Sequence, residues 1–353
     1  MPSVRQDVLQ SLLKRGHRDT VLEARLDFSE WESFRRYVEP LEGQGRAHPD
    51  MLPTQASGRW STTDPPLVNF PPDCINPACP QVGTEHMARG LPCWSVRDVI
   101  VPDPGWWWLG FDWQAVEARI AAADAGDEED LEAFAKGYDI HLFTLCTVFG
   151  LSRPPDLTHY HTSPECAEWR EKYKWQGKDD RRRIVSKNVK YGLAYAKNEK
   201  GLLALKGIGK LGLSTSELLR IGRMYLTSKP KYKIWKTTWW YVAASTGETR
   251  TCYGTRRKLF GLRESVEKEG LNHRVQGTVA DMMDEVIINF QAEWPESRIV
   301  YQSHDGLKWA FPVSHLPSVV MPRAREIIEA EREIGGRKIP FPADFTTTQG
   351  GTV

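Results

Sequence analysis

The sequence lacks the features of a secreted or membrane-inserted chain. Arg5 and Asp7 stand where a signal peptide would carry its apolar segment, and no apolar run approaches the length of a membrane span. Internal repeats and low-complexity linkers are absent as well. These absences predict a cytoplasmic protein without a membrane partner. The 353 residues are enough to bury a sizeable core and to form two or three subdomains.

Net charge is almost absent too, because 47 Lys and Arg residues face 46 Asp and Glu residues, a formal net of +1. A chain so balanced has no general attraction for polyanions. The local balance differs, since residues 170–200 hold eleven basic and four acidic side chains, a net of +7. A basic band in a neutral chain indicates a phosphate-binding surface, and a solvated charge run is the alternative.

The six cysteines include none of the close pairs that are typical of zinc sites. Without a secretion signal, we expect a reducing compartment and no disulfides. The segment 71–93, rich in Pro and Cys and without periodicity, is predicted to be an insertion loop. It carries four soft ligands, Cys74, Cys79, His86 and Cys93, which fit a tetrahedral structural zinc site. A long loop with unbound thiols is the alternative.

Helical periodicity dominates the pattern and short strands fill the rest, so the predicted fold class is α+β. The aromatic run Gly105–Asp112 predicts a buried strand. Hairpins are predicted over Gly247–Leu262 and over Arg298–Phe311, the second with a turn at 303–306. A last strand is predicted over Ile339–Phe345. The predicted helices are Val4–Lys14, Phe28–Val38, Val116–Ala125, Asp127–Lys136, Asp139–Gly150, Pro164–Trp175, Arg181–Lys197, Ser214–Leu226, Lys231–Ala244, Val266–Trp294 and Pro322–Ile334.

The helix predicted over Arg181–Lys197 has two cations and two phenols at a spacing of four residues. Arg183, Lys187, Tyr191 and Tyr195 therefore share one slowly drifting helical face. Such a face can hold a polyphosphate at its basic end and stack a base or sugar at its aromatic end. The alternative is a solvated helix start that leads into a pair of core aromatic residues.

Two aspartates lie where predicted strands end. Asp112 ends the aromatic strand, and Asp305 lies in the turn of the later hairpin. If these strands are neighbours, the two carboxylates meet at one edge of the sheet. Paired carboxylates suit Mg²⁺, and two such ions support in-line phosphoryl transfer. Two unrelated aspartates, one in a turn and one at a strand end, are the alternative.

Four segments, in order along the chain, resemble motifs of the family A DNA polymerases, those like bacterial DNA polymerase I. The resemblance runs from about residue 35 to the C-terminus, with weaker matches at Gly58-Arg59-Trp60-Ser61, Asp139-Ile140-His141 and Tyr253–Arg257. The four stronger matches are Asp112–Arg119 with Glu117, Arg183-x3-Lys187-x3-Tyr191-Gly192-x2-Tyr195, Asn272–Asp281 with Gln276, and Gln302-Ser303-His304-Asp305.

The resemblance implies a template-directed DNA polymerase in which Asp112 and Asp305 hold two Mg²⁺ ions. Arg183 and Lys187 are then expected to grip the triphosphate of the incoming dNTP, with His141 as a further phosphate contact. The resemblance also assigns Glu117 to exclusion of a ribose hydroxyl, Tyr191 to stacking near the sugar, and Tyr195 to the templating base. It assigns contacts to primer–template DNA to Arg59, Arg256, Asn272, Gln276 and His304.

The resemblance further implies a right-hand architecture with an antiparallel-sheet palm and helical fingers. It predicts a thumb-base remnant at 1–56, palm at 57–119 and 263–353, and fingers at 120–262. On this interpretation most of the thumb and a proofreading exonuclease are missing. We therefore expect a separate protein to supply the grip on the duplex, and a phage or mobile-element source. Gly306 stands where the family often has a glutamate.

Two other interpretations remain open from the sequence. A relative of the single-subunit RNA polymerases shares a tyrosine at the position of Tyr191, but that lineage lacks the bulky gate that Glu117 provides. A catalytically weak DNA-binding subunit of a replication complex would not need the metal-binding aspartates or the cations of the predicted helix. Since these residues are present, the sequence favours the polymerase.

Overall fold

The computed structural model describes residues 50–52, 61–63, 101–177, 180–195, 213–303 and 305–349. The helices predicted before residue 50 and the insertion loop 71–93 lie outside these ranges. Within the described ranges, no helix is both long and apolar enough to cross a membrane. The helices are α4 (Val116–Ala125), α5 (Glu128–Ala135), α6 (Ile140–Phe149), α7 (Ala167–Lys172), α8 (Arg181–Tyr195), α9 (Thr215–Ser228), α10 (Pro230–Thr246), α11 (Arg263–Asn272), α12 (Thr278–Glu293) and α13 (Pro317–Ile328).

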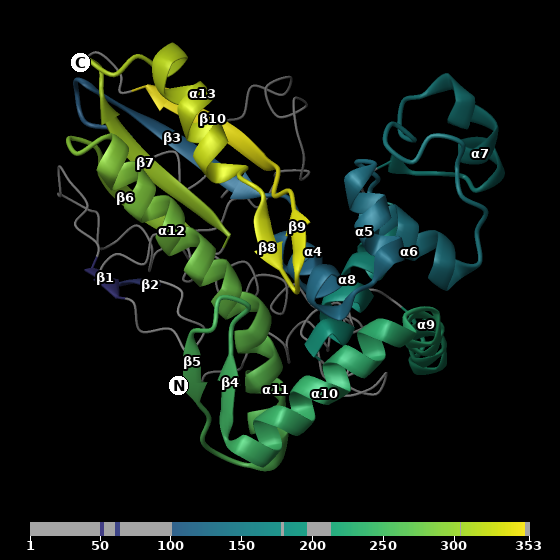
Figure 1. The fold of residues 1–353 in the computed structure, drawn as a ribbon. Coiled ribbons are helices and arrows are strands. Elements are labelled where there is room, and N and C mark those ends of the chain that lie inside the picture. Colours follow the sequence, from purple (N-terminus) through teal and green to yellow (C-terminus); the bar gives the residue numbers. More distant parts are fainter. Residues whose placement is uncertain are drawn as a thin grey trace, which may run out of the picture.

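A four-stranded antiparallel sheet in the order β10-β3-β7-β6 forms one half of the molecule, with α12 and α13 packed beside it (Figure 1). Helices α5 to α9 form the other half, α4 lies between the halves, and α10 runs along the bottom of the view from α11 to α9. Three further pairs of short strands are separate from this sheet. The strands are β1 (Asp50–Leu52), β2 (Ser61–Thr63), β3 (Trp106–Trp113), β4 (Glu248–Arg250), β5 (Arg256–Lys258), β6 (Arg298–Ser303), β7 (Gly306–Pro312), β8 (Arg332–Ile334), β9 (Arg337–Ile339) and β10 (Ala343–Gln349).

The aromatic strand β3 is buried over most of its length, as its composition predicts, and only Asp112 is exposed. Aromatic residues from the sheet and α12 form the centre of the core. The ring of Phe290 lies edge-on to that of Trp309, with 5.3 Å between centroids, and Trp294 packs in the same way on Phe311. The large apolar area removed from water here is the main stabilising term for this half of the molecule.

The prediction for the C-terminal part is wrong in its boundaries. The predicted helix Pro322–Ile334 is instead α13, which begins with Pro317 in its first turn and has Pro322 inside it. It ends at Ile328 because the guanidinium of Arg332 donates to the carbonyls of Ile327 and Ile328. Arg332 then begins β8, where a helix was predicted, and the predicted last strand is divided between β9 and β10. Helical periodicity could not reveal a cap supplied by a side chain beyond the helix.

Two other predicted helices are interrupted. The segment predicted as Val266–Trp294 is helical, but α11 and α12 are joined by a π-helical turn, His273–Gly277. The segment Pro164–Trp175 forms a short 3-10 turn followed by α7, which ends at Lys172. Most other predicted helices in the described ranges agree with the structure to within two residues.

A buried ionic cluster connects α5, α8 and the start of α10. The ammonium of Lys229 donates to Asp130 at 2.7 Å and to Glu129 at 2.9 Å, and Lys190 of α8 pairs with the same Asp130. Asp127 lies 3.2 Å from Lys229. Burial would raise the pKa of Asp130, but the two ammonium groups hold it below its usual range. The cluster fixes how these helices pack.

We expect Lys229→Met to lower the free energy of unfolding by about 3–5 kcal/mol, because it leaves buried carboxylates without a counter-charge. Chemical denaturation followed by circular dichroism measures this loss. Lys136→Met is the matched control, since Lys136 forms an exposed pair with Glu132 within α5 and should matter little. Equal losses in the two variants would show that the buried cluster contributes nothing specific.

Candidate active site at the edge of the sheet

The two predicted metal-binding aspartates meet where β3 ends and β7 begins. Asp112 lies opposite Gly306 in the register of the two strands, and the amide of Trp113 donates to the carbonyl of Asp305 at 3.2 Å. The expectation that the aromatic strand and the hairpin are neighbours is therefore confirmed. Asp112 is exposed and Asp305 is half-buried. Both residues therefore lie near the surface at the edge of the sheet where the two central strands, β3 and β7, have their ends.

The turn after β3 carries the chain from Asp112 to Glu117. Ala115 has a left-handed backbone with φ 52°, which is uncommon for a residue other than glycine. The turn is held by Arg119, whose Nε donates to the carbonyl of Gln114 at 3.0 Å and whose Nη1 donates to Pro340. Burial lowers the pKa of Arg119 to about 10. Arg119 therefore supports this turn structurally, although it belongs to one of the matched motifs.

The π-helical turn brings a second predicted residue to Glu117. Gln276 Nε2 donates to Glu117 Oε1 at 3.2 Å, across 159 residues of sequence. Gly277 is required here, because a Cβ at this position would lie 2.8 Å from Thr251 Cγ2. Asn272, which ends α11, has a buried Oδ1 without a hydrogen bond to any described residue. A buried polar atom without a partner in a native protein needs an explanation, and a bound ligand is one.

Helices α6 and α8 pack against each other and bring three predicted phosphate contacts together. The Nε and Nη2 groups of Arg183 donate to Asp139 Oδ2 at 3.0 and 2.8 Å. Asp139 Oδ1 caps α6 by accepting from the amides of His141 and Leu142. One carboxylate thus joins the basic end of α8 to the start of α6.

His141 is neutral at pH 7 in this arrangement. Burial, against the opposing charge of Asp139 and together with the charges of Arg183, Lys190 and Lys187, lowers the pKa of its imidazole to about 4. Lys187 is exposed on α8. The electrostatic influence of both Arg183 and Lys187 on His141 indicates a common basic site at this end of α8.

Sequence reasoning missed several residues that hold α8 in place. Tyr160 donates to Asp139 Oδ2 at 2.8 Å, and Lys190 is buried in the ionic cluster. At the other end of the helix, Lys236 of α10 donates to the carbonyl of Leu193 at 2.9 Å, and burial lowers the pKa of Lys236 to about 8. A positive charge at the carbonyl end of a helix is favourable. Contacts between helices, however, leave no mark on the local periodicity of the sequence.

Some predicted residues remain untested by the structure. α8 includes Tyr191 and Tyr195, but their side chains lie outside the described residues, as do Arg59 and His304. The four predicted zinc ligands, Cys74, Cys79, His86 and Cys93, also lie outside them. Arg256 lies on β5, where it pairs with Glu248 of β4 at 2.7 Å.

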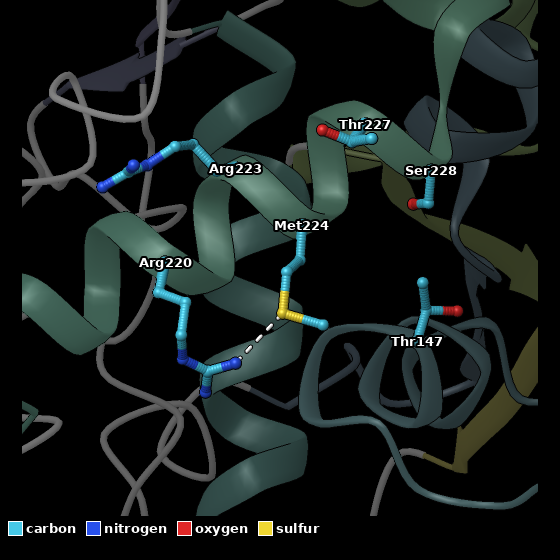
Figure 2. A pocket seen from close by; sticks show the side chains of 6 residues that line it. All are labelled: Thr147, Arg220, Arg223, Met224, Thr227 and Ser228. Atoms are coloured by element: carbon cyan, nitrogen blue, oxygen red, sulfur yellow. Dashed lines mark hydrogen bonds between the residues drawn. The ribbon is translucent and has the colours of Figure 1, made fainter.

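A groove between α6 and α9 is separate from these residues (Figure 2). Its lining includes Thr147 of α6 with Arg220, Arg223 and Met224 of α9. In Figure 2 the guanidinium of Arg220 turns along its own helix toward Met224. Arg220 Nη1 lies 3.0 Å from Met224 Sδ. None of the predicted catalytic or DNA-contacting residues lines this groove.

The residues at the sheet edge fit Mg²⁺. Asp112 and Asp305 supply hard carboxylate oxygens from adjacent strands, and an exposed edge leaves room for water and substrate oxygens. Among the described residues, no group of three or more His, Cys, Asp and Glu side chains is arranged to hold a metal. A pair of carboxylates such as Asp112 and Asp305 suits an ion that is also bound by substrate.

Comparison with known proteins supports a family assignment. Residues 1–349 match the family described as DNA polymerase family A. The chain is 27% identical over 308 residues to the thermostable DNA polymerase I of Thermus thermophilus, which covers 83% of this chain and 32% of that protein. It is 26% identical over 262 residues to DNA polymerase I of Chloroflexus aurantiacus, which covers 71% of this chain and 23% of that protein. The chain spans about a third of the length of the curated relatives it matches.

A solved structure has a similar fold. It is described as the POL domain of Pol1 from M. smegmatis in complex with DNA primer-template and dNTP, and the similarity has a TM-score of 0.72 at 24% identity. It covers 99% of this chain and 56% of that chain. The mixed α+β fold is therefore shared with a polymerase domain. The relatives named above are bacterial and give no support to the predicted phage source.

Proposed function

The chain belongs to DNA polymerase family A, and from this premise we propose that it extends a primer 3′-hydroxyl with dNTPs under the direction of a template. The observation that carries the proposal is the meeting of Asp112 and Asp305 at one edge of the sheet. The basic end of α8, with Arg183 and Lys187, supplies a matching site for a triphosphate. Carboxylates for metal ions and cations for phosphates are the two parts that phosphoryl transfer needs.

The proposed palm consists of 57–119 and 263–353, and the proposed fingers of 120–262. The four-stranded sheet draws β3 from the first palm segment and β6, β7 and β10 from the second, which supports their union in one subdomain. Helices α5 to α9, all from the segment 120–262, lie together on the other side of the molecule (Figure 1).

In the proposed mechanism, Asp112 and Asp305 hold Mg²⁺ at the sheet edge. When bound, Mg²⁺ activates the primer hydroxyl and neutralises the charge that develops on the transferred phosphoryl group. Arg183 and Lys187 grip the triphosphate, and their positive charge stabilises the leaving pyrophosphate. His141, neutral beside them, donates a hydrogen bond from its protonated ring nitrogen to a phosphate oxygen.

The sugar and base of the incoming nucleotide are assigned to Glu117, Tyr191 and Tyr195. Glu117 lies against C2′ and excludes a ribose hydroxyl, Tyr191 stacks near the sugar, and Tyr195 stacks with the templating base. The hydrogen bond from Gln276 orients the Glu117 carboxylate, which supports a fixed gate. Glu117 and Gln276 would then lie at the nascent base pair.

The DNA contacts are assigned to Asn272, Gln276 and Arg256, together with Arg59 and His304. Amide and guanidinium groups can donate to the minor-groove acceptors N3 and O2, which every correct base pair presents. Asn272 and Gln276 both belong to the segment around the π-helical turn, so one rigid element would carry both contacts.

Primer extension tests this function. The purified chain, a labelled primer–template and the four dNTPs should give extended products in the presence of Mg²⁺ and none with excess chelator. A template with a different sequence should give products that match its own complement. Failure to extend any primer, with DNA binding retained, would favour the DNA-binding subunit and overturn the proposal.

We expect Glu117→Ala to raise incorporation of rNTPs relative to dNTPs by about 10- to 100-fold, because it opens the space beside C2′. Single-nucleotide incorporation, measured as kcat/KM for each sugar, gives the ratio. Glu128→Ala is the control, since Glu128 is an exposed glutamate at the start of α5. If the parent already uses rNTPs as well as dNTPs, the RNA polymerase interpretation becomes the better one.

A further inference from the structure

Arg183 is held along one edge of its guanidinium. Both Nε and Nη2 donate to Asp139 Oδ2, and Nε also donates to the hydroxyl of Tyr160 at 3.2 Å. Within the described part of the chain, Nη1 makes no hydrogen bond. The side chain is partly exposed, at 21%. The hydrogen bonds of Nε and Nη2 fix the orientation of the guanidinium, and with it the direction in which Nη1 points.

Asp139 serves several donors at once. Oδ1 accepts from two amides of the first turn of α6, and Oδ2 accepts from Arg183 and from the Tyr160 hydroxyl at 2.8 Å. Because the same carboxylate caps the helix of His141 and holds Arg183, its orientation sets both groups. The Tyr160 hydroxyl is the only side-chain hydroxyl in this network among the described residues.

Tyr160 comes from the segment between α6 and α7, which is rigidly packed. Its side chain is 1% exposed. Its carbonyl accepts from Arg170 Nη1 at 2.9 Å, and its ring lies against Trp175 with 5.5 Å between centroids. Trp169 also packs edge-on to it. These contacts hold the Tyr160 hydroxyl beside Asp139.

We propose that Tyr160 is a positioning residue for the nucleoside triphosphate, which acts by holding the Asp139–Arg183 pair in the orientation that receives a phosphate. The inference rests on the proposed polymerase function and adds to it a residue outside the matched motifs. The hydroxyl donates to Oδ2 and accepts from Nε, so it links both members of the pair. Pre-orientation of a binding group lowers the cost of ordering it when the ligand arrives.

Burial of the aromatic ring has a separate structural role, and the two roles can be distinguished. A phenylalanine at this position keeps the ring and its packing but removes the hydroxyl. We expect Tyr160→Phe to raise the KM for dNTP by about three- to tenfold, the net effect of one ordinary hydrogen bond, with a smaller change in kcat. The affinity for primer–template and the melting temperature should stay near those of the parent.

Tyr173→Phe is the matched control. Tyr173 directly follows α7 and packs on Trp169, which also contacts Tyr160, while its own hydroxyl lies 2.9 Å from Ser152 Oγ. We expect its KM for dNTP to equal that of the parent. An equal rise in KM for the two variants would show that the segment acts only through its overall fold.

A double-mutant cycle decides whether Tyr160 acts through Arg183. In an Arg183→Ala background, Tyr160→Phe should have no further effect on kcat/KM, whereas a purely structural role would give an additive loss. If Tyr160→Phe fails to fold, Asp139→Asn tests the same hold, because asparagine still caps a helix but loses the charge that pairs with Arg183. That variant should likewise raise the KM for dNTP.

The failure of this inference differs from the failure of the proposed function. A parent that extends primers, together with a Tyr160→Phe variant of unchanged KM or an additive cycle, overturns only the role of Tyr160. A parent that extends no primer overturns the polymerase and this inference with it.

Discussion

Asp305→Ala should lower kcat for primer extension by about 10³-fold, since loss of a metal-holding carboxylate removes several kcal/mol of transition-state stabilisation at 1.36 kcal/mol per tenfold. The reason lies in the register of the sheet, which brings Asp305 beside Asp112. Single-turnover extension with saturating dNTP and Mg²⁺ measures the chemical step. DNA binding and the melting temperature should change little, because Asp305 is half-buried in the turn between β6 and β7 and is not part of the core.

Asp344→Ala is a demanding control for this prediction. Asp344 lies on β10 directly opposite Asp112 and is exposed, and its Oδ1 accepts from Gln114 Nε2 at 2.8 Å. This substitution removes one negative charge from the same edge of the sheet as Asp305→Ala does. We expect the kcat of Asp344→Ala for primer extension to stay within about threefold of the parent's, the scale of a lost exposed contact. A loss as large as that of Asp305→Ala would show that the metal-binding pair is misassigned.

Lys187→Ala should lower kcat/KM for dNTP by about 10²- to 10³-fold, the usual effect of removing one group that stabilises developing charge. Both components should change, with KM raised because the triphosphate loses a cation and kcat lowered because the leaving pyrophosphate loses it too. Steady-state incorporation of a single dNTP at varied concentration gives the two values. Lys187 is exposed on α8, so its loss should not unfold the protein.

Arg181→Ala is the matched control on the same helix. Arg181 is also an exposed cation of the first turn, but six residues from Lys187 it lies about 120° away around the helix axis. We expect kcat/KM for dNTP to fall only slightly in Arg181→Ala, because the variant lowers the local positive charge without removing a phosphate contact. An unchanged kcat/KM in Lys187→Ala would remove this face of α8 from the active site, and the carry-over from the family motif would then fail for this helix.

The two cations on the predicted ligand-binding face of α8 have different environments. The four-residue spacing suggests that Arg183 and Lys187 are equivalent, but the structure distinguishes them. Arg183 is tied to Asp139 and Tyr160, whereas Lys187 is exposed one turn later. A held guanidinium is suited to fixing a phosphate in one geometry, and a mobile ammonium is suited to following charge as it develops.

Local pattern was sufficient for the elements that carry the site. The buried strand was predicted from its aromatic composition and the helix from Arg181 from its four-residue period, and both signals are local in the sequence. The prediction was poorest at the C-terminus, where the guanidinium of Arg332 ends α13 and the chain turns into β8. The hydrogen bonds of one side chain decide such a boundary, and helical periodicity contains no trace of them.

The sequence by itself determined which residues this protein has available: two strand-end aspartates, a basic helical face, and the order of motifs that places it in its family. Only the tertiary structure decided which of them meet. The register of β3 with β7 joins residues about 200 positions apart, and Asp139 finds Arg183 across 44 residues and Tyr160 across 21. Secondary structure follows from short-range geometry that the sequence repeats, whereas these pairings depend on how buried surfaces pack, which no local window of sequence records.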